Sequence, residues 1–353
     1  MAPVVRELRR RANRFEQLVV ATGQHREMLE QVLAPFEITP DVNLELMQPG
    51  QDPAEFAARA IAGLSRLFAD EKPAAVLLQG DTTTVMSAAI AGCYRRVAVG
   101  HVEAGLRSFD RNNPFPEEIN RRVAGCLADF HFAPTVRARD NLLREGVREE
   151  RIFVTGNTVV DAIRMMRLDG PFENESLNLL PFARRRVLMV TAHRRENHGP
   201  PLADICQALR LIAANFHDVE IVYPVHLNPN VHRLVTDVLG SVPRIHLLEP
   251  VSYGDLLRLM QRCYFILTDS GGIQEEAPSF QKPVLILRDV TERPEVVEVG
   301  AGRIVGTQTE RIVAEASRLL TDPAAYAAMA SATNPFGDGH AAERIADALD
   351  EAL

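Results

Sequence analysis

The feature that most constrains the fold is a regular alternation of short, continuous apolar runs with amphipathic stretches along nearly the whole chain. Residues 53–68 show the spacing of a helix, with Phe56, Ala60 and Leu64 on one face. Apolar runs without polar alternation are typical of parallel strands buried on both faces, so the pattern predicts helix-covered parallel sheets. The predicted strands are 16–22, 74–79, 97–102, 129–133, 152–155, 187–191, 219–224, 245–248, 265–268 and 284–287.

The alternation is interrupted once, in the stretch "RLDGPFENESLNLLPFARR". Its prolines, glycine and polar residues predict a linker between about Leu168 and Ala183. A chain of 353 residues is long enough for two cores. We therefore expect one domain over 1–168, a second over 183–334, and a C-terminal helix over 335–353 that packs back on the first domain.

The chain opens on "MAPVVRELRRRA", which predicts a helix with Pro3 in its first turn. Doubly wound domains usually open with a strand whose following loop helps to form the ligand crevice. We therefore expect that a first strand is absent and that the natural protein is longer, with Met1 an internal methionine.

Composition excludes several classes of function. The net charge of −8 argues against general binding to nucleic acid, and no apolar run is long enough for a membrane span. No signal-peptide pattern is present, so the expected location is the cytoplasm. The cysteines form no CxxC pair and lie in apolar contexts, which predicts core residues and no disulfide framework or zinc site. They are Cys93, Cys126, Cys206 and Cys263.

Acidic residues follow two predicted strands of the first domain, namely Asp81 after 74–79 and Glu103 after 97–102. Ligands of open α/β sheets bind beyond the carboxyl ends of strands, so both acids are candidates for a reaction site. Asp81 could instead cap the helix that follows it, and Glu103 could be a solvated loop acid. The pair Glu117-Glu118 opens a further helix, where the helix dipole alone would favour acids.

Two segments of the second domain suit a phosphorylated ligand. "VTAHRRENHG" places His193, Arg194 and Arg195 at the end of a strand, where cations suit a pyrophosphate. His193 and His198 do not have the spacing of an HExxH zinc motif, so no metal is expected.

In "LTDSGGIQEEA", the turn Ser270-Gly271-Gly272 lets a ligand approach the backbone at a helix start. Glu276, one turn further on, could accept hydrogen bonds from ribose hydroxyls. An ordinary helix cap is the alternative interpretation, but turn, glycines and acid together favour a nucleotide site. "GAGRIVG" lacks the third glycine of a dinucleotide fingerprint and no GxxxxGK[ST] occurs, so neither NAD nor ATP hydrolysis is expected and no cofactor is predicted.

The ordered motifs "QHREML", "GDTTT", "GHVEAGLRS", "PFPEEINR", "TGNTVVDA", "TAHRREN", "YPVHLNPNV", "LTDSGGIQEEAPSFQKPVLILRDVTERPE" and "NPFGDGHA" resemble those of bacterial non-hydrolysing UDP-N-acetylglucosamine 2-epimerases. The resemblance implies an α/β fold of GT-B type, with two doubly wound Rossmann-like domains and the active site in the interdomain cleft. It also implies a homodimer that interconverts UDP-N-acetylglucosamine and UDP-N-acetylmannosamine without NAD. The implied route eliminates UDP to 2-acetamidoglucal and adds it back.

The resemblance carries over to individual residues. Asp81, Glu103 and Glu117 match the essential carboxylates of the family, and His193 matches its essential histidine near the leaving diphosphate. Such chemistry needs cations for the leaving group and carboxylates that move protons. The matches to nucleotide-binding positions are Ser270, Gly271, Gly272, Glu276 and Arg293.

Two departures from the family pattern and one further match stand out. The chain lacks the first strand and the "GTRPEAIK"-like loop that carries a substrate-binding arginine and lysine. Val251 and Leu256 stand where relatives often carry glutamine and phenylalanine near the uracil. The segment containing Gln24, His25 and Glu27 matches one that holds a second, activating UDP-N-acetylglucosamine in some relatives.

Three other functions remain open at this stage. A hydrolysing epimerase would release UDP and free N-acetylmannosamine. A GT-B glycosyltransferase would need an acceptor and give no epimer. A truncated, inactive nucleotide-sugar binder would be stabilised by UDP without turnover.

Overall fold

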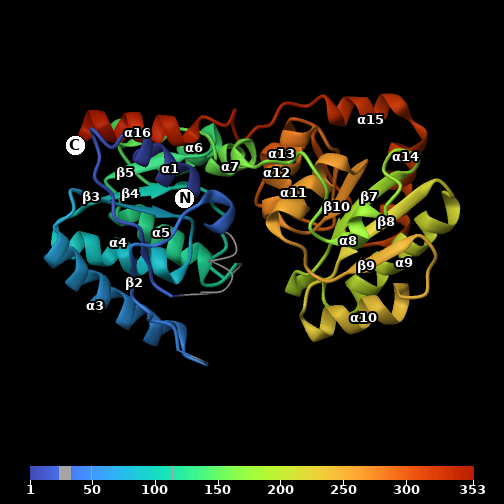
Figure 1. Cartoon of the computed structure of the whole chain (residues 1–353), viewed down its shortest axis with the longest axis horizontal. Helices are drawn as coiled ribbons and strands as arrows, with labels where there is room; N and C mark the ends of the chain where they lie inside the picture. The colour runs from blue at the N-terminus through green and yellow to red at the C-terminus, as the bar shows by residue number, and fades with distance from the viewer. Residues whose placement is uncertain (24–32, 49, 113) are drawn as a thin grey trace. The chain divides into compact units, whose positions relative to one another are not determined.

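The computed structural model describes residues 1–23, 33–48, 50–112 and 114–353, which form two compact units (Figure 1). Unit 1 comprises Met1–Met166 together with Phe336–Leu353, and unit 2 comprises Arg167–Pro335. Each unit contains a parallel sheet with helices packed on it, as the alternation of apolar runs predicts.

The main sheet of unit 1 has the strand order β3-β4-β5-β6, and every pair is parallel. The strands are β3 (Ala75–Gln79), β4 (Ala98–Val102), β5 (Phe130–Ala133) and β6 (Ile152–Val154). Two further short strands, β1 (Val20–Ala21) and β2 (Val42–Asn43), pair in parallel as a separate ladder. Gln79 lies opposite Val102, so the carboxyl ends of β3 and β4 are level.

Helices of unit 1 bury apolar faces against its sheet and against one another. Phe56, Ala60 and Leu64 of α3 are buried, as their helical spacing predicts, and α3 packs closely on α4. The helices and short 3-10 segments are α1 (Ala2–Arg10), η1 (Ala34–Phe36), α3 (Pro53–Glu71), α4 (Thr83–Arg95), α5 (Glu117–Leu127), α6 (Val136–Arg144), η2 (Glu149–Arg151), α7 (Thr158–Met165) and α16 (Ala341–Ala352).

The C-terminal helix α16 belongs to unit 1, where it lies beside α1 and α7 (Figure 1). Val4 and Leu8 of α1 share a buried cluster with Ile345 and Leu349 of α16. The buried carboxylate of Asp161 accepts hydrogen bonds from the backbone N–H groups of residues 341 and 342, at 3.1 and 2.8 Å. These contacts fix the start of α16 on α7.

The sheet of unit 2 has the order β12-β11-β10-β7-β8-β9, and all its pairs are parallel. The strands are β7 (Arg186–Thr191), β8 (Val219–Pro224), β9 (Ile245–Leu248), β10 (Phe265–Thr268), β11 (Val284–Ile286) and β12 (Gly302–Ile304). The chain runs outward from β7 to β9, returns to β10 beside β7, and then runs outward on the other side. The strand order therefore reverses between β7 and β10, where ligands of doubly wound sheets bind.

Unit 2 has the larger apolar core. Strands β7, β8 and β10 are buried almost throughout, and Leu188, Ile221 and Leu267 pack with buried residues of α9, α10 and α14. The helices and 3-10 segments are α8 (Glu175–Asn178), η3 (Arg195–Asn197), α9 (Pro200–Asn215), α10 (Pro229–Leu239), α11 (Tyr253–Arg262), α12 (Gly271–Glu276), η4 (Ala277–Phe280), α13 (Pro294–Glu298), α14 (Thr309–Thr321) and α15 (Pro323–Ala330).

One prediction about the cysteines is wrong. Cys206 and Cys263 are buried, but Cys93 and Cys126 are exposed. Both exposed residues lie on helices, α4 and α5, whose opposite faces pack against the sheet and each other. An apolar neighbourhood in the sequence therefore did not identify the buried face. Among the helices that the structure describes, none has the length and apolar character needed to cross a membrane.

Candidate functional site

Asp81 follows β3 and is held by helix α5. Gly80, with φ +84°, turns the chain at the end of the strand. Arg121 Nη2 donates to Asp81 Oδ2, and the side-chain amide of Asn120 donates to the Asp81 carbonyl at 3.0 Å. The cap of α4 is Thr82, whose hydroxyl accepts from the Val85 N–H at 3.4 Å. The capping role considered for Asp81 is therefore excluded, and its carboxylate is held by an arginine.

Glu103 lies at the end of the neighbouring strand, β4. Because Gln79 pairs with Val102, Glu103 is adjacent to the turn that carries Asp81. A Cβ added at Gly80 would lie 3.5 Å from Glu103 Oε2, and Gln79 Nε2 donates to Glu103 Oε1 at 2.9 Å. Glu103 has φ +64°, a left-handed conformation that is strained for a residue with a Cβ. Such strain is typical of functional positions.

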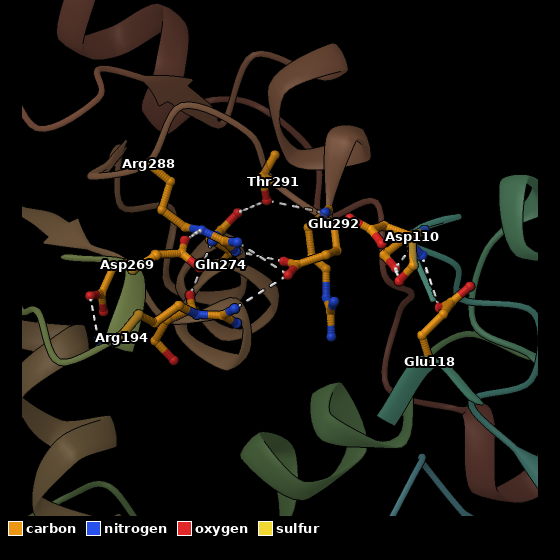
Figure 2. Close-up of polar contacts among 12 residues, drawn as sticks. Asp110, Glu118, Arg194, Asp269, Gln274, Arg288, Thr291 and Glu292 are labelled. Atoms are coloured by element: carbon orange, nitrogen blue, oxygen red, sulfur yellow. Dashed lines mark hydrogen bonds and ion pairs between the residues drawn. The ribbon is translucent and has the colours of Figure 1, made fainter. Parts of the chain in front are cut away.

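The two acids of the Glu117-Glu118 pair have different surroundings. The Glu118 side chain is fully buried and accepts from the Ser108 N–H at 3.0 Å, from Arg121 Nη1 at 3.2 Å and from Arg122 Nε at 3.0 Å. It anchors the loop after Glu103 to α5 (Figure 2). Glu117 is only half-buried and lies one helical turn before Arg121, on the face of α5 that holds Asp81. The structure thus places Asp81 and Glu103 at the level carboxyl ends of β3 and β4, and Glu117 in the first turn of the helix that holds Asp81.

Two buried histidines support this part of unit 1. Burial lowers the pKa of His101 to about 4 and that of His131 to about 4, so both rings are neutral at pH 7. The neutral His101 ring donates from Nε2 to the Gly80 carbonyl at 2.8 Å. Sequence reasoning missed this contact and the roles of Gln79 and Arg121, because each bridges elements far apart in the chain.

His193 lies at the switch point of unit 2, two residues beyond the end of β7. Its half-exposed ring stacks on His226, with centroids 5.2 Å apart and planes 13° apart. The backbone N–H groups of His193 and Arg194 both donate to Asp269 Oδ2 at 2.8 Å. Burial lowers the pKa of His193, and the nearby Asp269 carboxylate partly opposes that shift.

Arginines converge on Gly271, just after β10. A Cβ added at Gly271 would lie 3.4 Å from Arg194 Nη2 and 3.6 Å from Arg293 Cζ. Arg194 pairs with Glu292 at 3.2 Å, and Arg293 donates from Nε to Glu275 at 2.6 Å. The backbone of Gly271 therefore lies close to two guanidinium groups, an arrangement that suits a phosphate or diphosphate.

A third arginine, Arg288, holds this cluster in place (Figure 2). Arg288 is almost fully buried and bridges Glu196 and Glu292, with an N···O distance of 2.6 Å to each. Although burial acts to raise it, the guanidinium groups of Arg288 and Arg194 lower the pKa of Glu292 to about 2. Glu292 is therefore ionised and orients Arg194.

The remaining candidates of unit 2 lie on α11 and α12. Glu276 at the end of α12 accepts from the Tyr253 hydroxyl at 3.0 Å. Burial and the neighbouring Glu275 raise its pKa to about 7, although the Tyr253 hydrogen bond acts to lower it. Leu256 is half-buried and lies three residues after Tyr253 on α11, so both share one helical face. Ser270 and Gly272 flank Gly271 in the turn before and within α12.

The predicted second binding site and the expected absence of a metal concern other parts of the chain. Gln24, His25 and Glu27, the residues predicted for the second site, lie outside the described residues. Within the part of the chain that the structure describes, no group of three or more His, Cys, Asp or Glu side chains has the geometry to hold a metal ion.

The sequence model of the family described as UDP-N-acetylglucosamine 2-epimerase matches residues 6–350. This chain belongs to that family. The UDP-N-acetylglucosamine 2-epimerase of Salmonella typhimurium is 50% identical over 355 residues, which cover 99% of this chain and 94% of the relative. The enzyme of Escherichia coli K12 is likewise 50% identical, over 356 residues that cover 99% of this chain and 94% of the relative.

Solved structures of epimerases agree with the assignment to this family. The Neisseria meningitidis UDP-GlcNAc 2-epimerase bound to UDP-GlcNAc superposes with a TM-score of 0.90 at 42% identity, covering 99% of this chain and 96% of that one. These neighbours confirm the α/β fold of GT-B type, with two Rossmann-like domains, that the motifs imply.

Proposed function

We propose that this epimerase interconverts UDP-N-acetylglucosamine and UDP-N-acetylmannosamine by eliminating UDP and adding it back. The observation that carries the proposal is the pair of guanidinium groups, from Arg194 and Arg293, that lie close to the backbone of Gly271. They lie where the strand order of unit 2 reverses, the usual position of a nucleotide in such sheets. The relatives named above carry the same activity in their names.

Unit 2 would bind the UDP moiety. Arg194 and Arg293 would hold the diphosphate, with Gly271 and Gly272 allowing its oxygens close to the backbone. The Glu276 carboxylate would accept hydrogen bonds from the ribose hydroxyls, and Tyr253 holds that carboxylate in place. The side chains of Ser270 and Leu256 would contact the nucleotide, with Leu256 beside the uracil.

The carboxylates of unit 1 would carry the chemistry of the sugar. The hydrogen on C2 is barely acidic because C2 bears no carbonyl, so the C1–O bond must break first. UDP departs with the electron pair of that bond and leaves an oxocarbenium ion at C1, which acidifies C2–H. A carboxylate then removes the C2 proton and 2-acetamidoglucal forms. Protonation of C2 on the opposite face and addition of UDP to C1 complete the epimerisation.

Inversion at C2 needs a proton acceptor and a proton donor on opposite faces of the sugar. Asp81, Glu103 and Glu117 supply three carboxyl groups at the ends of two adjacent strands and the start of α5. Developing positive charge at C1 is stabilised by nearby carboxylates, and each proton transfer is general acid–base catalysis. His193 would act at the leaving diphosphate.

Product identity tests this proposal most simply. The purified chain is incubated with UDP-N-acetylglucosamine, and the sugars are resolved by NMR. The proposal predicts UDP-N-acetylmannosamine, absent in a Glu103→Gln variant. Free N-acetylmannosamine with UDP would identify a hydrolysing enzyme instead, and UDP-induced thermal stabilisation without turnover would identify an inactive binder.

We further propose that the protein is a homodimer and acts in the cytoplasm. Both proposals rest on the resemblance to bacterial epimerases. Light scattering coupled to size-exclusion chromatography tests the first, because a 39.1 kDa chain gives twice that mass as a dimer. Recovery of the protein in the monomeric peak at micromolar concentration would contradict it.

A further inference from the structure

The side chain of Asp269, directly after β10, is completely buried, and its two oxygens have different surroundings. Oδ2 accepts three hydrogen bonds, from the backbone N–H groups of His193 and Arg194 at 2.8 Å and from Asn197 Nδ2 at 3.0 Å. Figure 2 shows the contact between Asp269 and Arg194. These three hydrogen bonds, called the loop clamp below, connect the loop after β7 to the end of β10. The loop clamp explains why Oδ2 is buried.

The second carboxylate oxygen of Asp269, Oδ1, takes no part in this loop clamp. Asp269 Oδ1 has no hydrogen-bond partner among the described residues, although it is buried. His193 Nδ1 lies 3.7 Å from this oxygen. That distance is longer than a hydrogen bond, but it places a ring nitrogen beside the carboxylate. Because a buried carboxylate oxygen without a partner costs free energy, its position beside a ring nitrogen calls for a functional explanation.

His226 packs against the face of the His193 ring. Its Nδ1 accepts a hydrogen bond from the Asn228 N–H at 3.0 Å, which fixes the orientation of the His226 ring. This ring stacks on His193. His193 is thus held by an imidazole across its face and approached by a carboxylate near Nδ1.

We propose that Asp269 is the positioning residue of His193: it accepts a hydrogen bond from Nδ1–H, which fixes the tautomer and leaves Nε2 as the nitrogen that faces substrate. The proposal rests on the role proposed for His193 at the leaving diphosphate. When Nε2 takes a proton, the buried carboxylate stabilises the imidazolium that forms. When the C1–O bond breaks, Nε2–H donates that proton to the departing diphosphate oxygen and the ring becomes neutral again.

The charged and titratable groups around His193 act in both directions. Burial lowers its pKa, Asp269 raises it, and His226, Arg194 and His198 lower it. Asp269 is the one acid among these neighbours. Its removal should therefore lower the pKa of the imidazolium further and move the alkaline limb of the pH profile of kcat/KM, where the imidazolium loses its proton, to lower pH.

The test compares the tautomer of His193 in the wild-type chain with that in Asp269→Asn. In this variant the single amide oxygen can still accept from the three donors now bound to Oδ2. The amide NH2 then faces Nδ1, which must accept, so the proton moves to Nε2. Long-range ¹H–¹⁵N NMR spectra of the full chain distinguish the two tautomers, and His193→Gln assigns the signal.

We expect the wild-type chain to carry the proton on Nδ1 and Asp269→Asn to carry it on Nε2. The variant should lose kcat by about 100-fold, in the range found when partners of functional histidines are removed, while KM stays within about twofold. Asn197→Ala is the matched control, because it removes a donor to Oδ2 and leaves Oδ1 unchanged. It should lower the thermal midpoint without changing the tautomer.

Two results would overturn the proposal. One is a wild-type His193 with its proton on Nε2, which needs no variant and holds even if Asp269→Asn fails to fold. The other is a folded Asp269→Asn chain with unchanged tautomer and kcat, which would leave Asp269 as a loop clamp only. A His193→Gln variant with full activity would instead remove the proposed role of His193, and the tautomer result would stand apart from that failure.

Discussion

At the scale of single residues, the proposed chemistry depends on charged groups that charged or polar side chains hold in place. Arg121 holds Asp81, Gln79 contacts Glu103, and Glu292 orients Arg194. These partners come from other elements, so the functional side chains have few free rotamers. A preorganised arrangement of this kind stabilises developing charge without reorganisation during the reaction.

The diphosphate contact of Arg293 should depend on its planar guanidinium. Replacing it by lysine in Arg293→Lys keeps the charge but removes the paired donors, so we expect UDP to bind about 10-fold to 100-fold more weakly. Isothermal titration calorimetry measures this. The control is Arg303→Lys, since Arg303 forms an exposed ion pair with Glu315 at 3.0 Å, and it should leave the affinity unchanged. Equal affinities for all three proteins would contradict the assignment of Arg293.

The affinity for UDP should also depend on pH through Glu276. The folded chain holds the pKa of this carboxyl at about 7, above its ordinary 4.5, so its ionised fraction rises between pH 6 and pH 8. A carboxylate that accepts from ribose hydroxyls should therefore bind UDP more tightly at pH 8 than at pH 6. Glu276→Gln should bind more weakly and keep only the pH dependence of the UDP phosphates. If the affinity of the wild type for UDP changes with pH no more than that of Glu276→Gln, the proposed contact of Glu276 with the ribose is wrong.

At the scale of elements, the loops after strands position the site. Gly105 follows Glu103 with φ +85°, and a Cβ there would lie 2.1 Å from the Ala138 carbonyl oxygen on α6. Only glycine allows the loop to approach α6 this closely. The same loop is anchored by Glu118, so the strained backbone of Glu103 is held from both sides.

A pair of glycine substitutions separates this close approach from backbone strain. Gly105→Ala and Gly146→Ala both place a Cβ at a positive φ, of +85° and +86°, but Gly146 has open space around it. We expect Gly146→Ala to lower the free energy of unfolding by about 1 kcal/mol. Gly105→Ala should cost at least about 3 kcal/mol, because backbone must move. Urea denaturation measures both, and similar losses for the two variants would show that the contact with α6 is unimportant.

The elements themselves were predictable from the sequence to different degrees. Strands β7, β8 and β10 lie within one residue of their predicted bounds, because strands buried on both faces have continuous apolar sequences. Strands β2 and β12 were missed, since segments of two or three residues show no period. The predicted strand over 16–22 forms a ladder only at Val20–Ala21.

The candidate site residues, too, were predictable only where the local sequence determines their position. Acids and glycines directly after strands could be found by position, as with Asp81, Glu103 and Gly271. Partners such as Arg121 and Asp269 could not be assigned, because a pairing across 40 or 76 residues depends on tertiary packing. The apolar sequence around Cys93 and Cys126 led to the wrong prediction that both are core residues. Such a sequence does not show which face of a helix packs against the rest of the unit.

At the scale of the whole molecule, each unit has its own sheet and core, and each holds different parts of the chemistry. The carboxyl groups proposed for proton transfer belong to unit 1. The cationic groups and the residues proposed to bind the nucleotide belong to unit 2. The two sets of functional residues can therefore be tested separately, by UDP binding for unit 2 and by turnover for unit 1.

Acid should destabilise unit 2 through Glu292. Its pKa is depressed to about 2 in the folded chain from an ordinary 4.5, so its contribution is present above pH 4.5 and is lost as the pH falls toward 2. Glu292→Gln should lower the free energy of unfolding by about 2–3 kcal/mol at pH 7. The difference in the free energy of unfolding between Glu292→Gln and the wild type should become smaller below pH 4. Denaturation curves recorded from pH 7 to pH 3 measure it, and a constant gap would contradict the ion-pair network.

If UDP leaves and returns, the hydrogen on C2 must exchange with the solvent. The NMR spectrum of UDP-N-acetylglucosamine incubated with the full chain in D₂O measures this exchange. We expect UDP-N-acetylmannosamine with deuterium at C2, and deuterium in the recovered UDP-N-acetylglucosamine as the reaction reverses. Epimerised product that retains its C2 hydrogen would contradict elimination and readdition.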